Sequence, residues 1–297
     1  MITTMSGPLD RIESSPTLIV IPGFLTEPHR LAQEHKPSVL DSIDPSALLD
    51  RRAWLKSMNA ICDDRVNIEC FKWGSQSVVH MLTDLVSSLI TRSQLLNLGS
   101  REFTIKLTQI AQELHSSWRE AREEADHSVN SLCERILAAP DPSSLVLIGH
   151  SLGARLALKA LNQLYQAGET CLPKLSAWAP ALSLSEMPCH SIAQLNAPPE
   201  IIYSRSDLVL KYIFPLGQGP KPQANLLGGL SLIKMLWNYD ETKRAIGLVG
   251  PPKDLLLLGE LSQDLSDRSM THLGYLPAAE SLFEESPYLS QLMPQSN

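Results

Sequence analysis

The sequence predicts an α/β fold, with a mostly parallel sheet of about six strands and helices on both of its faces. Short apolar segments rich in β-branched residues alternate with longer segments in which apolar residues recur every three or four positions. Strands that are apolar on both sides are typical of parallel sheets covered by helices. A length of 297 residues without a repeat, a low-complexity tract or an obvious linker favours a single domain over residues 1–297.

The strands are predicted from compact apolar segments bounded by turn residues. Residues 17–21 are the clearest case, because Thr-Leu-Ile-Val-Ile is followed at once by Pro22 and Gly23. Residues 145–148 (Leu-Val-Leu-Ile) follow a turn that contains Pro-Asp-Pro. The full set of expected strands is 17–21, 66–71, 145–148, 175–179, 201–203 and 255–258.

Helices are predicted between these strands from apolar residues at helical spacing. The pair Asp44 and Pro45 is typical of a helix start, and a pattern of leucines and Trp54 follows it. The other expected helices are 78–96, 103–118 with an extension to Ile136, and 152–165.

A long excursion at 208–253 separates the last two expected strands and contains several prolines and glycines. Loops of this length in compact domains are usually functional or disordered. Its apolar segment 226–237 fits either a lid over a binding site or an ordinary buried helix, and the sequence leaves both open.

Composition and charge restrict the classes of function. The formal net charge of −7 disfavours nucleic acid as a partner, because phosphate binding needs a basic surface. The five cysteines are dispersed without metal-ligand spacing, which indicates free thiols in a reducing compartment, and neither a metal nor another cofactor is expected. No apolar run reaches the length of about twenty residues that a transmembrane helix needs. We therefore expect a cytoplasmic protein with no transmembrane segment, for which transient contact with a membrane surface stays open.

Residues 149–153 (Gly-His-Ser-Leu-Gly) match the G-x-S-x-G pattern of a nucleophile elbow. The pattern directly follows the expected strand 145–148 and directly precedes the expected helix 152–165, which is the context that the motif requires. A sharp turn there would expose the hydroxyl of Ser151, and the glycines would let strand and helix approach each other. The alternative is that Ser151 only caps the helix that follows it.

At this motif the chain resembles the α/β-hydrolases, over residues 149–155 (Gly-His-Ser-Leu-Gly-Ala-Arg). More narrowly, it is similar to the hydrolase-like family of unknown function that includes transmembrane and coiled-coil domain protein 4. Three other segments carry the narrower resemblance, namely 71–73 (Phe-Lys-Trp), 203–212 (Tyr-Ser-Arg-Ser-Asp-Leu-Val-Leu-Lys-Tyr) and 271–275 (Thr-His-Leu-Gly-Tyr). The resemblance implies an α/β-hydrolase fold and a serine hydrolase.

A serine nucleophile needs a base, and the base needs a carboxylate that holds its tautomer. In the α/β-hydrolase fold the three residues follow the order Ser, Asp or Glu, His. His272 is the predicted base because it lies beyond the last expected strand, whereas His190 precedes the candidate acids. His150 is expected to serve packing or substrate contact. The histidines expected to be solvated or satisfied locally in helices are His80, His115 and His127.

Asp207 is the predicted acid, because it follows the expected strand 201–203 by a short loop and because the resemblance implies an acid there. The alternative for Asp207 is a cap on a helix that starts at Leu208. The other candidates for the acid are Asp240, Asp254, Asp264 and Asp267.

Acyl transfer also builds an oxyanion, which needs two preorganised N–H donors. The first predicted donor is the backbone N–H of Leu152, the residue after the nucleophile. The second is the backbone N–H of Phe24, because Pro-Gly-Phe at 22–24 resembles the His-Gly-Phe loop of many lipases.

The leading hypothesis is hydrolysis of a carboxylic ester, from a small molecule or a lipid, through an acyl-enzyme on Ser151. A thioesterase, an amidase or an acyltransferase could use the same three residues. A catalytically silent hydrolase fold that acts as an interaction module is the alternative from a different class. The sequence does not indicate an oligomeric state.

Overall fold

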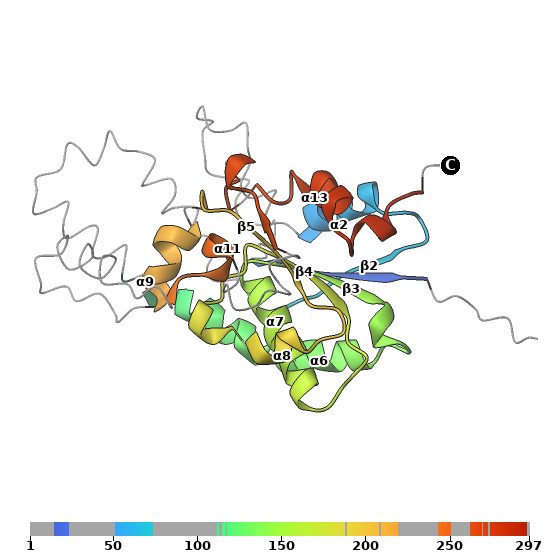
Figure 1. Ribbon diagram of the computed structural model, residues 1–297, viewed down its shortest axis with the longest axis horizontal. Helices are drawn as coiled ribbons and strands as arrows, with labels where there is room; N and C mark the ends of the chain where they lie inside the picture. The colour runs from blue at the N-terminus through green and yellow to red at the C-terminus, as the bar shows by residue number, and fades with distance from the viewer. Residues whose placement is uncertain are drawn as a thin grey trace, which may run out of the picture.

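The computed structural model of the protein is organised around one six-stranded sheet (Figure 1). The residues that it describes are 15–23, 51–73, 112, 115–116, 118–187, 189–207, 209–218, 243–250, 262–268, 270–272 and 274–295. The strands lie in the order β2-β1-β3-β4-β5-β6, and every neighbouring pair is parallel. Their bounds are Thr17–Ile21 (β1), Asn67–Cys70 (β2), Leu145–His150 (β3), Lys174–Trp178 (β4), Glu200–Tyr203 (β5) and Ser262–Asp264 (β6).

Strands β1 to β5 lie where the sequence predicts them. β1 coincides with the predicted segment 17–21, and the ends of β2 to β5 lie within about two residues of the predicted ends. β6 (Ser-Gln-Asp) was not predicted, because this short polar segment at the edge of the sheet carries no apolar signal. The predicted strand 255–258 lies outside the described residues.

Helices cover both faces of the sheet (Figure 1). One face carries α6, α7 and α8, and the other carries α2 and α13. The bounds of these helices are Arg51–Ile61 (α2), Val129–Leu137 (α6), Leu152–Gln166 (α7), Cys189–Ala193 (α8) and Ala279–Glu285 (α13). The α/β class with a mostly parallel sheet is therefore confirmed.

Three of the predicted helices can be compared with the structure, at least in part. The helix predicted from Asp44 through Trp54 and Leu55 is confirmed over its later residues, which lie in α2. The helix predicted at 152–165 is α7, and the predicted extension to Ile136 is confirmed by helical residues 118–127 followed by α6. Residues 44–50 and 78–96, and most of the predicted helix 103–118, lie outside the described residues.

The buried apolar side chains of the described elements form one hydrophobic cluster. β3 is buried along its whole length, and α7 is buried over most of its length, because both lie at the centre of the molecule. The cluster also includes side chains of the last described segment, such as Phe283 and Leu292. A single domain over 1–297 includes residues outside the description and stays a prediction.

The excursion 208–253 is described in two parts, 209–218 and 243–250. The first part contains a π-helix, η4 (Val209–Ile213), and then α9 (Phe214–Gln218). The second contains the short helix α11 (Ile246–Val249). Residues 226–237, predicted as a lid or a core helix, lie outside the described residues.

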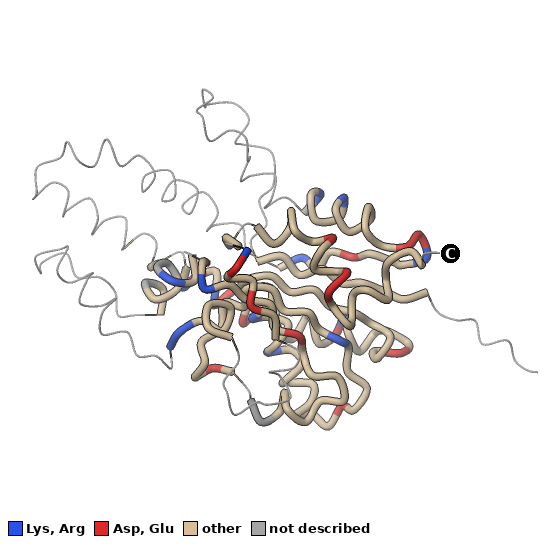
Figure 2. Tube along the Cα trace, turned by 45° about the horizontal axis from the view of Figure 1, so that its top comes forward, with Lys and Arg blue, Asp and Glu red and all other residues tan. Residues whose placement is uncertain are grey.

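The charged residues of the described chain are interspersed, with Lys and Arg next to Asp and Glu over the visible elements (Figure 2). Several of them form ion pairs, and one group of pairs surrounds Arg155, a buried residue of α7 whose acidic partners are partly buried. Among the described residues, we find no helix that combines the length and the apolar character needed to cross a membrane.

Candidate active site

The candidate site lies where the strand order of the sheet reverses. β1 pairs with β2 on one side and with β3 on the other, so the connections after β1 and β3 diverge from the carboxyl ends of these neighbouring strands. In open parallel sheets, ligands bind outside the carboxyl ends of the strands at such a point. Gly23 lies just beyond β1 there, and Ser151 follows β3.

Ser151 has a strained backbone between β3 and α7, with φ 55° and ψ −118°. A positive φ is costly for a residue with a Cβ, and such strain persists only where the surroundings enforce it. Here the N–H of Ser151 donates to the carbonyl oxygen of Trp178 at 2.9 Å, while its own carbonyl accepts from Arg155 and Ala181, each at 3.1 Å. The side chain makes no capping hydrogen bond, so the alternative of a simple helix cap is wrong.

The two glycines of the motif are required by close contacts. A Cβ added at Gly149 would lie 2.6 Å from the Cα of Ala154, and a Cβ at Gly153 would lie 1.9 Å from the carbonyl oxygen of Ile21. Both distances are far below van der Waals contact. Only glycine at these two positions lets α7 start directly beneath β1 and β3.

The structure brings Ser151, His272 and Asp207 into one chain of hydrogen bonds. Nε2 of His272 lies 2.9 Å from Oγ of Ser151, and Nδ1 lies 2.7 Å from Oδ2 of Asp207. Since an ionised carboxylate only accepts, Nδ1 carries the proton and Nε2 is free to accept from the serine hydroxyl. Such an arrangement can remove the hydroxyl proton as the oxygen attacks an electrophile.

All three side chains are buried. Ser151 and Asp207 have an exposed fraction of 0%, and His272 has 4%. Charge separation between the imidazole and the carboxylate therefore takes place away from bulk water, where electrostatic interactions are stronger.

Asp207 meets both expectations raised by its sequence context. Oδ2 contacts His272, while Oδ1 accepts a hydrogen bond from the backbone N–H of Leu210 at 3.0 Å, in the manner of a helix cap. Of the competing acids, Asp264 lies in β6 and pairs with Arg205, and Asp267 lies in the next helical turn. Asp240 and Asp254 lie outside the described residues.

The other histidines do not contact Ser151 in the described part of the chain, His150 apart. His127 is exposed on the helical segment 118–127, and His115 is buried in the helical residues before it. His80 lies outside the described residues, and the side chain of His190 is not described.

His150 precedes Ser151 in the sequence and contacts His272 in space. Nε2 of His150 donates to the backbone carbonyl oxygen of His272 at 3.0 Å. Burial, together with the nearby ring of His272, lowers the pKa of His150 to about 3. The expected packing role is present, and the contact with His272 is one that the sequence did not reveal.

The predicted oxyanion donors fall on two loops. Leu152 is the first residue of α7, so its N–H has no acceptor within the helix and lies next to Ser151. Phe24 lies outside the described residues, but Gly23 is described, and a Cβ there would lie 2.6 Å from Cβ of Ser151. Gly23 therefore lies directly against Ser151.

Trp73 is a further residue of the site that the sequence did not single out by role. Its indole Nε1 donates to the carbonyl oxygen of Pro22 at 2.8 Å, and the side chain is buried just after β2. This bond fixes the peptide between Pro22 and Gly23 beside Ser151. The only signal in the sequence was the Phe-Lys-Trp segment of the family resemblance.

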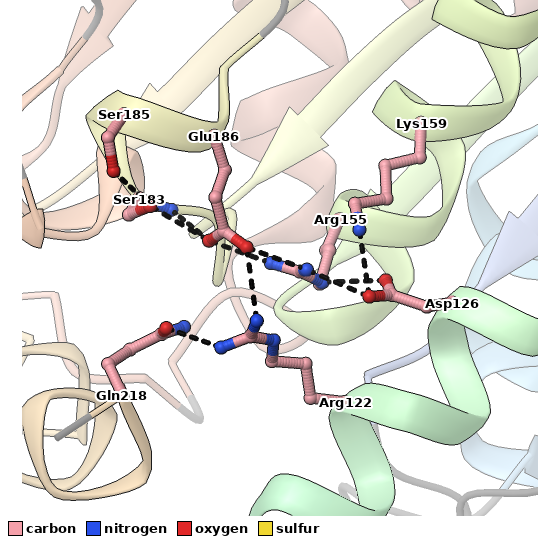
Figure 3. Close-up of polar contacts among 8 residues, drawn as sticks. All are labelled: Arg122, Asp126, Arg155, Lys159, Ser183, Ser185, Glu186 and Gln218. Carbon is pink, nitrogen blue, oxygen red and sulfur yellow. Dashed lines mark hydrogen bonds and ion pairs between the residues drawn. The ribbon is translucent and has the colours of Figure 1, made fainter. Parts of the chain in front are cut away.

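A buried arginine lies on α7, four residues after Ser151 (Figure 3). The guanidinium of Arg155 forms bidentate hydrogen bonds of 2.9–3.0 Å with Asp126 on one side and with Glu186 on the other. Burial tends to raise the pKa of Glu186, but the hydrogen bonds and charge of Arg155 outweigh it and hold that pKa at about 2. A buried guanidinium needs such partners, because an unpaired charge there would be costly.

The same network reaches the excursion that follows Asp207. Arg122 pairs with Glu186 at 3.4 Å and hydrogen-bonds Gln218 at the end of α9 (Figure 3). Lys159 adds a contact of 2.8 Å to Asp126. These contacts hold α7, the helical segment 118–127 and the turn after β4 in one arrangement.

No family model, curated protein or solved structure matches the chain. Within the described ranges, no group of three or more His, Cys, Asp and Glu side chains is arranged to hold a metal ion. Any assignment of function therefore depends on the geometry of the site itself.

Proposed function

We propose that this protein is a serine hydrolase of the α/β-hydrolase fold that cleaves a carboxylic ester through an acyl-enzyme. The observation that carries the proposal is the hydrogen-bonded chain from Ser151 through His272 to Asp207, with Ser151 on a strained turn between β3 and α7. Chain order, hydrogen-bond pattern and position at the switch point of the sheet all agree with this class of enzyme.

In the proposed reaction, Oγ of Ser151 attacks the ester carbonyl while Nε2 of His272 takes the hydroxyl proton. The N–H of Leu152, and by the sequence argument that of Phe24, stabilise the oxyanion. His272 then gives the proton to the leaving alcohol, and an acyl-enzyme remains on Ser151. Water, deprotonated by the same imidazole, releases the acid and restores the serine. Small-molecule and lipid esters are both within this proposal.

A second candidate is a hydrolase fold without turnover that serves as an interaction module. The complete burial of Ser151 favours it, since a substrate can reach the hydroxyl only if neighbouring atoms move aside. The intact chain of hydrogen bonds favours the enzyme, because an inactive fold has no need for a basic imidazole at the serine.

Covalent labelling separates the two candidates. We expect a small serine-directed fluorophosphonate to modify Ser151, because His272 can activate its hydroxyl. Mass spectrometry of the labelled peptide locates the adduct, and Ser151→Ala should take up none. An unlabelled wild-type protein that is folded by circular dichroism would support the interaction module and contradict the enzyme.

Substrate preference follows from a panel of matched acyl compounds. Esters, thioesters and amides of one acyl group, in short and long chain lengths, would be compared by kcat/KM with Ser151→Ala as the blank. We expect the esters to be turned over fastest. Faster turnover of a thioester or an amide would leave the proposed roles of Ser151, His272 and Asp207 unchanged but would change the proposed substrate class.

A further inference from the structure

The side chain of His150 is enclosed by aromatic rings beside the site. Its exposed fraction is 6%, and its ring centroid lies 4.9 Å from that of His272, 5.6 Å from Tyr275 and 5.7 Å from Trp54. His150 is also the last residue of β3, so its backbone is fixed by the sheet one residue before Ser151. Its backbone is therefore held by the sheet, and its ring is held by the neighbouring rings.

The hydrogen bond of His150 is directed at backbone rather than at a reacting atom. A carbonyl oxygen only accepts, so the contact of 3.0 Å with the carbonyl of His272 requires a proton on Nε2 of His150. Burial keeps this imidazole neutral, with a pKa of about 3. In the pH range in which an ester hydrolase would work, the ring is therefore neutral, and its contact with the carbonyl selects the tautomer that carries the proton on Nε2.

His272 needs such an anchor because it lies outside the regular secondary structure. It belongs to a turn between β6 and α13, and its ring must reach Ser151 and Asp207 at the same time. We propose that His150 is a positioning residue, which fixes the backbone of the base relative to the strand that carries the nucleophile. This inference rests on the proposed function, since it assigns the part that His150 plays in the same reaction.

The expected effect is on kcat rather than on KM. Without the hydrogen bond from His150, the imidazole of His272 could still accept a proton but would be displaced from Ser151. A displacement of about 1 Å in a catalytic group can cost about 100-fold in rate. Because Nε2 of His150 is bonded to the backbone of His272 and its ring packs against Trp54 and Tyr275, we expect ground-state binding to be unaffected.

The test compares two substitutions of equal length. His150→Gln keeps an N–H donor at about the reach of Nε2, whereas His150→Met keeps the length and removes the donor. Hydrolysis of a p-nitrophenyl ester would be measured per active site, with sites counted by fluorophosphonate labelling, so that unfolded protein does not contribute. We expect kcat to fall by about 10- to 100-fold in His150→Met with KM unchanged, and to recover most of the loss in His150→Gln.

A control for general destabilisation is available on α7. Leu161→Ala removes a buried side chain remote from the three residues and should lower the melting temperature without changing kcat per site. His150→Leu offers a second donor-free side chain if the methionine variant does not fold.

The outcomes separate this inference from the proposed function. If the wild type neither labels nor hydrolyses any ester, the proposed function fails and the inference fails with it. If the wild type is active and the donor-free variants keep at least half of its kcat, the function stands and the positioning role is overturned. Equal losses in His150→Gln and His150→Met would likewise overturn it, because they would show that ring packing and not the hydrogen bond matters.

Discussion

The two carboxylate oxygens of Asp207 have different partners. Oδ2 holds Nδ1 of His272, and Oδ1 caps the helical turn at Leu210. One side chain thus links the imidazole to the start of the excursion, and its two functions can be separated by substitution.

For Asp207→Asn, we expect a normal fold and a fall in kcat of up to about 10⁴-fold, because the amide still caps Leu210 but favours the wrong tautomer of His272. Asp207→Ala should lose the cap as well, at about 1 kcal/mol of stability. Thermal melting together with ester turnover measures both effects. Near-normal turnover in Asp207→Asn would contradict the acid role and transfer it to Asp240 or Asp254.

At the scale of secondary-structure elements, the contact between α7 and β1 depends on one missing methyl group. Gly153 places the first turn of α7 against the carbonyl of Ile21, at a distance that excludes any Cβ. At the other end of α7, Gly168 has φ +91° and open space around its Cα hydrogens. Glycine is therefore favoured for different reasons inside α7, at Gly153, and just beyond its end, at Gly168.

Gly153→Ala should destabilise the protein by roughly 1–3 kcal/mol or more and abolish ester turnover, because α7 must shift away from β1 and carry Ser151 with it. Gly168→Ala should cost about 1 kcal/mol through its positive φ alone and leave turnover unchanged. Chemical denaturation of both variants, with turnover measured in parallel, checks this. Full activity in Gly153→Ala would contradict the close contact.

The elements that the sequence predicted best are those in which one side chain after another is buried. β1 and β3 to β5 are mostly apolar, and α7 repeats its apolar residues at helical spacing, so local pattern and final environment agree. β6 escaped prediction because an edge strand of three polar residues has no such pattern. The order Ser151, Asp207, His272 could also be inferred, since the elbow motif implies it.

Contacts between distant parts of the chain could not be predicted in the same way. The bond from His150 to the carbonyl of His272 joins residues 122 positions apart, and that from Trp73 to Pro22 joins residues 51 apart. Neither contact leaves a local pattern, because each depends on how strands and turns meet at one end of the sheet.

At the scale of the whole molecule, a partly buried carboxyl group, that of Glu186, and a buried one, that of Glu200, should make the stability depend on pH in opposite directions. The pKa of Glu186 is lowered to about 2 from 4.5, so its contribution is present above pH 4.5 and is lost as the pH falls toward about 2. Burial raises the pKa of Glu200, although hydroxyl groups of Ser176 and Ser286 donate to it. Its contribution is present at low pH and is lost as the pH rises through the raised pKa.

In Glu186→Gln, the free energy of unfolding should therefore fall less steeply as the pH is lowered from 4.5 toward about 2 (the acid limb of the stability curve). The same variant should be less stable at neutral pH, because Arg155 loses a charged partner. Glu200→Gln is the matched control, since it removes a buried carboxyl whose pKa is raised rather than lowered. In this variant the loss of stability at low pH should be the same as in the wild type. Urea unfolding between pH 2 and pH 7 gives the free energies (a range of about two units on either side of the ordinary carboxyl pKa). An unchanged acid limb in Glu186→Gln would contradict the assignment.

The position of β1 between β2 and β3 also bears on biosynthesis. Thr17 pairs with Asn67 in β2 on one side and with Leu145 in β3 on the other. Strand β1 therefore leaves the ribosome well before β3, its second neighbour in the sheet, has been synthesised. At a synthesis rate of about 5–20 residues per second, that delay is on the order of ten seconds. During this interval an apolar strand lacks a neighbour, and such strands are what chaperones bind. The yield of folded protein in a cell should then depend on chaperone supply and on the speed of translation as well as on the stability of the finished fold.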